Sequence, residues 1–237
     1  VAMASKILKG KRLQCFTIDT EEFARNEGFS NDLDYAKLVA ADLNVDLEIV
    51  NSEVDIVKDF DKMIWHLDEP QADPAPLNVL NISERAKEMG YKVLIGGAGG
   101  DDVFSGYRRH QILKYENFLD KVPSPILSIL GSLGDKIKPS SPNLRRAKKL
   151  MSGMRYGSSA ERVFNLFTWL PEDTIKGIFS KPFQEALDSK DPFHYFKDKL
   201  SEIPEEKDLL NQMLHLEMST FLVDHNFNYT DKMGMAT

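Results

Sequence analysis

Hydrophobic residues follow two different periods in the first part of the chain. Four segments carry apolar residues at helical spacing and predict amphipathic helices: 1–8, 32–44, 52–67 and 77–90. Three segments that are rich in β-formers or wholly apolar predict strands: 12–18, 45–50 and 92–97. Strands that alternate with helices indicate right-handed crossovers and a parallel sheet with helices on both faces. The pattern therefore predicts an α/β fold for this region.

Polar residues and glycines predict where these elements end. Ser52 is a suitable N-cap for the third helix, and Gly90 closes the fourth. Residues 19–32 are mostly polar and predict a loop. After about residue 105 the chain has no convincing strand, and further segments have helical spacing: 162–170, 182–189, 192–200 and 206–233. We therefore expect an α/β part at 1–105 and an all-helical part at 106–237.

Composition excludes several classes of protein. The chain has 237 residues, of which 42% are hydrophobic, and a formal net charge of −7, so it is globular and not a general nucleic-acid binder. The single cysteine, Cys15, excludes an internal disulfide and fits a reducing compartment, so we expect a cytoplasmic protein. No apolar run approaches the roughly 20 residues that span a bilayer, and we expect no membrane partner. The basic stretch 136–155 predicts a solvated face.

The segment GGAGGDDVFSGYRRH, residues 96–110, carries the candidate chemistry. Four glycines precede Asp101 and Asp102, directly after a predicted strand. Ligands of open parallel sheets bind beyond the carboxyl ends of the strands, and glycine lets a backbone approach a ligand closely. Carboxylates suit Mg²⁺, and Arg108 and Arg109 suit anions. The residues alone leave two interpretations open: a nucleotide and Mg²⁺ site, or a glycine-rich turn with solvated carboxylates.

Five segments resemble, in order, the synthetase domain of glutamine-dependent asparagine synthetases, among them LQCFTID (13–19) and NDLDYAKLVAADLNVDLEIV (31–50). LIGGAGGDDVFSGYRRH, residues 94–110, is similar to the family's LSGxGxDExFGGY. IWHLDEPQADPAPLNVLNISERAKEMGYKVLIGG, residues 64–97, is similar to its xxHxDEPxADPSxxPxYxLSxxAxxxxKVxLSG block. DHNFNYTDKMGMAT, residues 224–237, resembles DLLxKxDRMSMAxSLE. The likeness spans nearly the whole chain, and residues 60–110 are its most specific part.

The resemblance implies a fold of the adenine-nucleotide α-hydrolase-like, or ATP-pyrophosphatase, type. It also implies asparagine synthesis, in which ATP activates the β-carboxylate of aspartate as β-aspartyl-AMP and releases pyrophosphate. Ammonia from an N-terminal glutaminase domain in the same polypeptide then displaces AMP. The implied cofactors are ATP and Mg²⁺, the implied substrate is aspartate, and a homodimer is left open.

The resemblance also assigns roles to individual residues. Asp101 matches the carboxylate that binds Mg²⁺–pyrophosphate, and Asp102 stands where the family has a glutamate near the aspartate and acyl-adenylate site. Both are candidate catalytic residues. Asp68 lies in the block that lines the same cleft and is a candidate substrate residue. Four residues match positions in contact with the nucleotide: Ile18, Gly96, Gly97 and Gly99.

The sequence also departs from the family pattern. Ala98 replaces a glutamate that is a candidate acid or base for the ammonia step. The family's pyrophosphate loop, its downstream lysine and its glutaminase domain are not in these 237 residues, so we expect a piece of a longer protein that is inactive by itself. The alternatives are a β-lactam-synthetase-like enzyme, an amidotransferase of a polysaccharide gene cluster, and a catalytically silent scaffold.

Overall fold

The computed structural model divides the chain into two units. It describes residues 1–8, 11–19, 32–51, 55–71, 73–138, 140–168, 170, 172–188 and 190–237. The α/β unit comprises Val1–Gly97 and Asp224–Thr237, and the helical unit comprises Ala98–Val223. This division differs from the predicted one, which placed the boundary near residue 105 and the end of the chain in the helical part. The last fourteen residues instead pack with the α/β unit.

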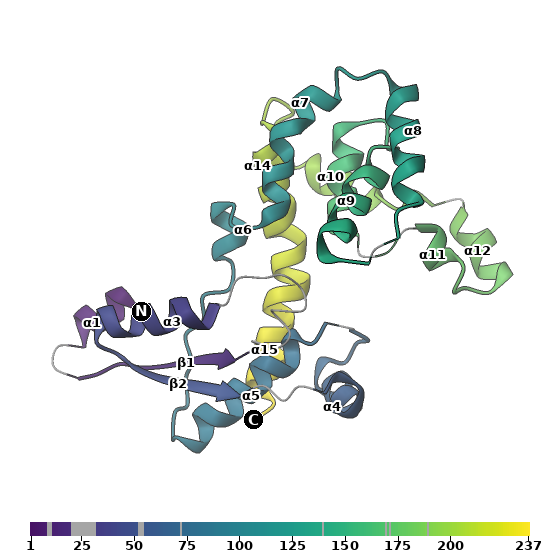
Figure 1. Cartoon of the computed structure of the whole chain (residues 1–237). Helices are drawn as coiled ribbons and strands as arrows, with labels where there is room; N and C mark the ends of the chain where they lie inside the picture. Colours follow the sequence, from purple (N-terminus) through teal and green to yellow (C-terminus); the bar gives the residue numbers. More distant parts are fainter. Residues whose placement is uncertain are drawn as a thin grey trace. The chain divides into compact units, whose positions relative to one another are not determined.

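A two-stranded parallel sheet forms the centre of the α/β unit. Strand β1 (Gln14–Asp19) pairs with β2 (Asp46–Asn51), and the register runs from Gln14 opposite Asp46 to Asp19 opposite Asn51. Helix α3 (Asp32–Leu43) lies between the two strands in the chain and buries Leu33 and Ala40. Figure 1 shows α3 on one side of this sheet and α5 (Ala75–Glu88) on the other. The α/β class is therefore confirmed. The predicted loop at 19–32 lies almost wholly outside the described residues.

The described part of the α/β unit contains three further helices. They are α1 (Ala2–Ile7), α4 (Ile56–Leu67) and α15 (Asn228–Met235). Helices α4, α5 and α15 share a core of five buried residues: Met63, Leu67, Leu77, Leu80 and Met233. Apolar residues at helical spacing on three helices therefore meet in one cluster.

One helix end differs from the prediction, and another agrees with it. Helix α4 begins four residues after the predicted N-cap, Ser52, which lies outside the described residues. Its N-cap is Asp55, which accepts hydrogen bonds from the backbone amides of Val57 at 3.0 Å and Lys58 at 3.1 Å. Gly90 follows α5 with a φ of +86°, as expected for a glycine that closes a helix.

The predicted strand at 92–97 is wrong. Residues 91–97 have no regular secondary structure, and their apolar side chains are open to solvent, with Ile95 95% exposed. An apolar run indicates that a segment favours burial, but a strand also needs a neighbouring backbone as its hydrogen-bond partner. Among the described residues, no strand pairs with this segment.

The helical unit contains no strand among its described residues, as predicted. Its first elements are α6 (Gly100–Phe104), the 3₁₀ helix η1 (Arg108–Tyr115), α7 (Glu116–Leu119), α8 (Ser124–Asp135) and α9 (Pro142–Gly153). The elements that follow are α10 (Ser159–Phe167), α11 (Glu172–Lys176), α12 (Lys181–Asp188), α13 (His194–Leu200), α14 (Leu209–Leu216) and the π-helix η2 (Glu217–Phe227). The helical unit ends within η2, at Val223.

The core of the helical unit is built from distant parts of its sequence. Its buried residues come from η1, α10, α14 and the turn before α13: Leu113, Val163, Phe164, Phe193, Met213 and Leu216. Phe164 stacks on Phe196 with ring centroids 5.4 Å apart. Nowhere in the described part of the chain is there a helix with both the length and the apolar character of a membrane span.

Candidate functional site

The glycine stretch ends in a short helix with two carboxylates in its first turn. Gly99, with a φ of +93°, precedes α6, and a side chain there would strain the backbone. Asp101 is exposed, whereas Asp102 is only 1% exposed. Two adjacent residues of the same type therefore occupy opposite environments: Asp101 can meet a ligand from solvent, and Asp102 lies inside the helical unit.

The carboxylate of Asp101 lies against the backbone of Gly106. A Cβ atom at position 106 would lie 1.8 Å from Oδ1 of Asp101 and 2.6 Å from its carboxyl carbon. The backbone amide of Gly106 donates to the carbonyl of Asp101 at 3.0 Å, and Ser105 closes α6 with a φ of +62°. Any side chain at position 106 would therefore displace this carboxylate.

Asp102 is buried with only part of its hydrogen-bonding capacity used. The hydroxyl of Tyr107 donates to Oδ2 at 3.3 Å, and Oδ1 has no hydrogen-bond partner among the described residues. Burial raises the pKa of Asp102, and the negative charge of Glu217 raises it further, against the opposing effect of the Tyr107 hydrogen bond. An ionised Asp102 is therefore costly to the folded state.

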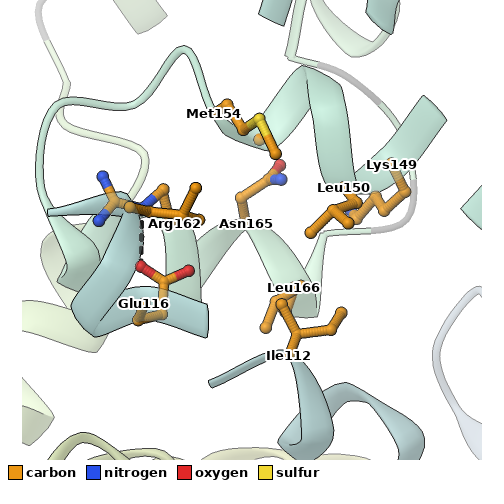
Figure 2. A pocket seen from close by; sticks show the side chains of 10 residues that line it. Ile112, Glu116, Lys149, Leu150, Met154, Arg162, Asn165 and Leu166 are labelled. Atoms are coloured by element: carbon orange, nitrogen blue, oxygen red, sulfur yellow. Dashed lines mark hydrogen bonds and ion pairs between the residues drawn. The ribbon is translucent and has the colours of Figure 1, made fainter. Parts of the chain in front are cut away.

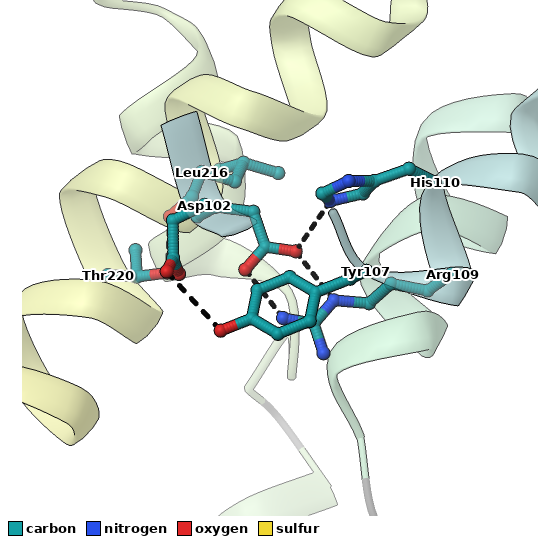
Figure 3. A network of polar contacts seen from close by, with 7 residues as sticks. Asp102, Tyr107, Arg109, His110, Leu216 and Thr220 are labelled. Carbon is teal, nitrogen blue, oxygen red and sulfur yellow. Dashed lines mark hydrogen bonds and ion pairs between the residues drawn. The ribbon is translucent and has the colours of Figure 1, made fainter. Parts of the chain in front are cut away.

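Glu217, the first residue of η2, lies beside Asp102 and is completely buried. Arg109 binds it through two hydrogen bonds, Nε to Oε1 at 2.5 Å and Nη2 to Oε2 at 2.6 Å. The Nε2–H of His110 donates to Oε1 at 3.1 Å. Figure 3 shows Arg109 and Tyr107 side by side, and the guanidinium carbon of Arg109 lies 4.1 Å from the Tyr107 ring centroid. We call Asp102, Tyr107, Arg109, His110 and Glu217 the Glu217 cluster.

Sequence reasoning found part of this cluster only. It singled out Arg109 as an attractor of anions, and the structure pairs that arginine with a carboxylate of its own chain. It missed Glu217, which lies 108 residues away from Arg109 in a segment that looked like an ordinary amphipathic helix. The available signal was a glutamate among apolar residues, in HLEMSTFL (215–222).

A second polar group connects two family-like segments within the α/β unit. Asp68 is the C-cap of α4, with a φ of +60°, and its side chain is 82% exposed. Lys232 of α15 donates to the carbonyl of Leu67, and its Nζ lies 3.9 Å from Oδ2 of Asp68. The carboxylate of Glu69 accepts a hydrogen bond from the amide of Asn228. The C-terminal end of α4 is thus bound to the last helix of the chain.

His225 makes further hydrogen bonds to the segment that follows α4. Its Nε2–H donates to Oδ2 of Asp73 at 3.0 Å, and its Nδ1 accepts from the amide nitrogen of Gln71 at 2.7 Å. Burial alone would raise the pKa of Asp73, but the hydrogen bonds from His225 and from the backbone of Ala75 outweigh it and lower that pKa. His225 has no metal-ligand spacing in the sequence, and only the structure reveals its partner.

The candidate site residues fall into two groups. Ile18, Asp68, Gly96 and Gly97 belong to the α/β unit, whereas Gly99, Asp101 and Asp102 share one turn of the helical unit. Ile18 is half-buried on β1, opposite Val50. A Cβ atom at Gly96 or Gly97 would meet no atom of the described chain, so no described contact requires glycine there. The roles predicted for these residues stay predictions.

Comparison with known proteins assigns the chain to a family. The family model described as asparagine synthase matches residues 1–237. The chain belongs to the asparagine synthase family. It is similar to asparagine synthetase (glutamine-hydrolyzing) 1 of Bacillus subtilis, with 26% identity over 234 residues, 94% of this chain and 33% of the relative.

Two further relatives of the asparagine synthase family carry similar names. A putative asparagine synthetase (glutamine-hydrolyzing) of Mycobacterium bovis is 29% identical over 149 residues, 62% of this chain and 21% of its own. A putative asparagine synthetase (glutamine-hydrolyzing) 2 of Methanocaldococcus jannaschii is 35% identical over 80 residues, 34% of this chain and 15% of its own. The chain thus spans about a third or less of the length of these relatives. No solved structure matches it at a significant level.

The helical unit of this family member also contains a small cavity, which is too small for a substrate. Figure 2 shows Ile112, Leu150, Met154 and Leu166 around it. Its volume of about 10 Å³ holds one water molecule at most. On its wall, Nζ of Lys149 contacts the carbonyl and hydroxyl oxygens of Thr168, and burial lowers the pKa of Lys149 to about 8. Lys149 therefore departs from the solvated face that the basic stretch predicted.

Proposed function

We propose that the chain is part of the ATP-dependent synthetase domain of an enzyme that makes asparagine. The proposed reaction activates the β-carboxylate of aspartate with ATP, which forms β-aspartyl-AMP and releases pyrophosphate. Ammonia from glutamine, released by a glutaminase domain of the same polypeptide, then displaces AMP. The family match over residues 1–237 and the names of the relatives support this reaction. The single cysteine, Cys15, fits a reducing compartment, and we assign the reaction to the cytoplasm.

The observation that carries the proposal is the placement of Asp101. Its carboxylate is exposed in the first turn of a helix, and Gly106 leaves the space that it occupies. Mg²⁺ in nucleotide sites is held by one or two carboxylates together with phosphate oxygens and water, and a single exposed carboxylate fits that requirement. Among the described residues, no group of three metal-binding side chains offers an alternative. When bound, Mg²⁺ would neutralise the charge that develops on the pyrophosphate leaving group.

The other candidate residues take supporting roles in this proposal. The open space beside Gly96 and Gly97 would let their backbone approach the nucleotide closely, and Ile18 would contact the adenine. The exposed side chain of Asp68 is available to the amino-acid substrate. Asp102 is too deeply buried to touch a substrate in this conformation, and we assign it a positioning role.

The decisive experiment replaces Asp101 by asparagine in the full-length protein. Asp101→Asn keeps the shape of the side chain and removes its charge. We expect aspartate-dependent pyrophosphate release to fall by on the order of a hundredfold or more, while glutamine hydrolysis is retained. Glu185→Gln, which neutralises an exposed carboxylate on α12, is the control and should leave both activities unchanged. Near-normal pyrophosphate release by Asp101→Asn at saturating Mg²⁺ would refute the assignment.

A further inference from the structure

We infer that Glu217 is a positioning residue that holds the two carboxylates of α6 in their working orientation. The inference rests on the proposed function, because it assigns Asp101 the contact with Mg²⁺ and the nucleotide. It goes beyond that function by naming a chain of contacts from the π-helix η2 to the candidate catalytic turn. All the residues in this chain of contacts belong to the helical unit.

The first step fixes Arg109. Glu217 is fully buried, and both of its oxygens are bonded to the guanidinium group of Arg109. A bidentate carboxylate–guanidinium pair sets the plane of the guanidinium as well as its position. His110 adds a third hydrogen bond to the same carboxylate from the next residue of η1. The start of η1 is thereby bound to the start of η2.

The second step fixes Tyr107. The guanidinium carbon of Arg109 lies 4.1 Å from the centroid of the Tyr107 ring, within the range of a cation–π interaction. The Tyr107 ring also makes two edge-to-face contacts. Its centroid lies 5.7 Å from that of the His110 ring and 6.2 Å from that of the Phe221 ring in η2. The orientation of the ring therefore depends on the position of Arg109, and the hydroxyl of the same ring donates to Asp102.

The third step connects Tyr107 to Asp101. Tyr107 holds Asp102 through its side chain, and its backbone directly follows Gly106, which lies against the Asp101 carboxylate. A shift of Tyr107 would therefore move both the α6 turn that carries Asp101 and Gly106, which lies beside the Asp101 carboxylate. No described contact of Glu217 reaches Asp101 directly, so the effect must pass through Arg109 and Tyr107.

The chemistry of the cluster favours positioning over stabilisation. A buried ion pair is often no more stabilising than apolar residues of the same volume, because both charges lose their water. This cluster also leaves Oδ1 of Asp102 and Nδ1 of His110 without partners among the described residues. Glu217 starts a π-helix, a conformation that is frequent at functional sites. An arrangement this costly is expected where orientation matters more than stability.

The test compares Glu217→Gln with Glu116→Gln. Glu116 is also buried and bonded to an arginine in the same unit, but this partner, Arg162, lies on α10. In the full-length protein, Glu217→Gln should raise the Mg²⁺ concentration for half-maximal pyrophosphate release by about tenfold and lower the maximal rate. Glu116→Gln should lose comparable stability and keep its Mg²⁺ dependence within about twofold. Tyr107→Phe, a milder change, should shift the Mg²⁺ dependence in the same direction as Glu217→Gln.

A second measurement does not depend on catalysis. The backbone amides of Val103 and Gly106 donate to the carbonyls of Gly99 and Asp101, so their hydrogen exchange in the 237-residue chain reports on the α6 turn. Exchange of these amides should rise by about tenfold in Glu217→Gln and stay unchanged in Glu116→Gln. Equal effects of the two variants, in either measurement, would overturn the inference.

The outcomes separate the inference from the proposed function. If the wild-type protein releases no pyrophosphate with aspartate and ATP, the proposed function fails, and the hydrogen-exchange comparison still decides whether Glu217 orders α6. If the wild-type protein is active and Glu217→Gln retains its Mg²⁺ dependence, only the positioning role fails. If Glu217→Gln does not fold, Tyr107→Phe decides, and an unchanged Mg²⁺ dependence in that variant overturns the inference.

Discussion

Among its described residues, the helical unit contains two ion pairs in which an arginine binds a buried glutamate, and the surroundings of the two pairs differ. Arg162, with a side chain 4% exposed, binds Glu116 at 2.7 Å, Asp120 at 2.5 Å and the carbonyl of Tyr156 at 3.3 Å. Arg109 instead binds Glu217 and stacks on aromatic rings, with Asp102 as a second buried carboxylate nearby.

The difference between the pairs lies in what remains unsatisfied. No buried polar atom of Glu116 or Arg162 lacks a partner, whereas the Glu217 cluster leaves one oxygen of Asp102 and one nitrogen of His110 without partners among the described residues. Saturated polar groups specify a packing arrangement, and unsatisfied buried groups reduce stability. We therefore read the Glu116 pair as structural and the Glu217 cluster as a part of the functional site.

The strongest stability test of this comparison removes the arginine of the structural pair. Arg162→Met leaves the buried charge of Glu116 without its partner, so the free energy of unfolding should fall by about 3–5 kcal/mol. Arg109→Met should cost less, because the Arg109 side chain is 23% exposed and His110 still binds Glu217. Urea denaturation of the 237-residue chain measures both. A larger loss for Arg109→Met would reverse the assignment of roles.

Asp102→Asn should have the opposite effect on stability. The raised pKa means that the folded protein binds a proton at Asp102 more tightly than the unfolded chain does, because burial and Glu217 disfavour the charge. The wild-type protein therefore loses stability as pH rises above about 4, the ordinary value for aspartate, and the variant lacks this loss. At pH 7 the variant should be more stable by about 1 kcal/mol and slower in pyrophosphate release.

Denaturation curves across pH 4 to pH 8 would check this prediction for Asp102. The stability difference between Asp102→Asn and wild type should grow with rising pH. A constant difference would mean that Asp102 titrates alike in the folded and unfolded states. The same outcome would contradict the inference that an ionised Asp102 destabilises the folded protein.

The last prediction concerns Lys149, a half-buried cation that contacts the neutral oxygens of Thr168. Burial lowers its pKa to about 8, below the value of about 10.4 for an unfolded chain. Between these values the unfolded chain binds more protons, so wild-type stability should rise as pH increases from 8 to 10. Lys149→Met should abolish this rise and be slightly more stable than wild type at pH 7. An unchanged slope in the variant would show that another group titrates.

Periodicity predicted most of the local structure. Apolar spacing located α3, α5, α10, α12, α13 and α14 but not α8 and α9, and β-rich segments located β1 and β2, because side-chain periods reflect the local backbone. The segment 92–97 is the exception: its apolar residues predicted a strand, and the structure leaves it unpaired. Pairing depends on a neighbouring backbone, which no local period can specify.

The glycine-rich turn that carries Asp101 and Asp102 could be located from the sequence. The arrangement of its side chains could not be predicted from the sequence. The order of glycines and carboxylates at 96–102 marked the site, and the resemblance assigned Asp101 its role. The different environments of Asp101 and Asp102 had no sequence signal, because adjacent identical residues look alike in any pattern. Glu217 of η2, more than a hundred positions further along the chain, lies near enough to raise the pKa of Asp102.

By itself, the sequence determined the α/β and helical character of the two parts, the glycine turn with Asp101, and the likeness to one family. Only the tertiary structure decided that Arg109 meets Glu217, that Asp73 meets His225, and that the last helix returns to the α/β unit. The reason is the sequence separation of these pairs, 108 residues in the first and 152 in the second. The spacing of apolar residues indicates which face of a helix or strand is buried. Only long-range packing decides which residues of other elements that face contacts.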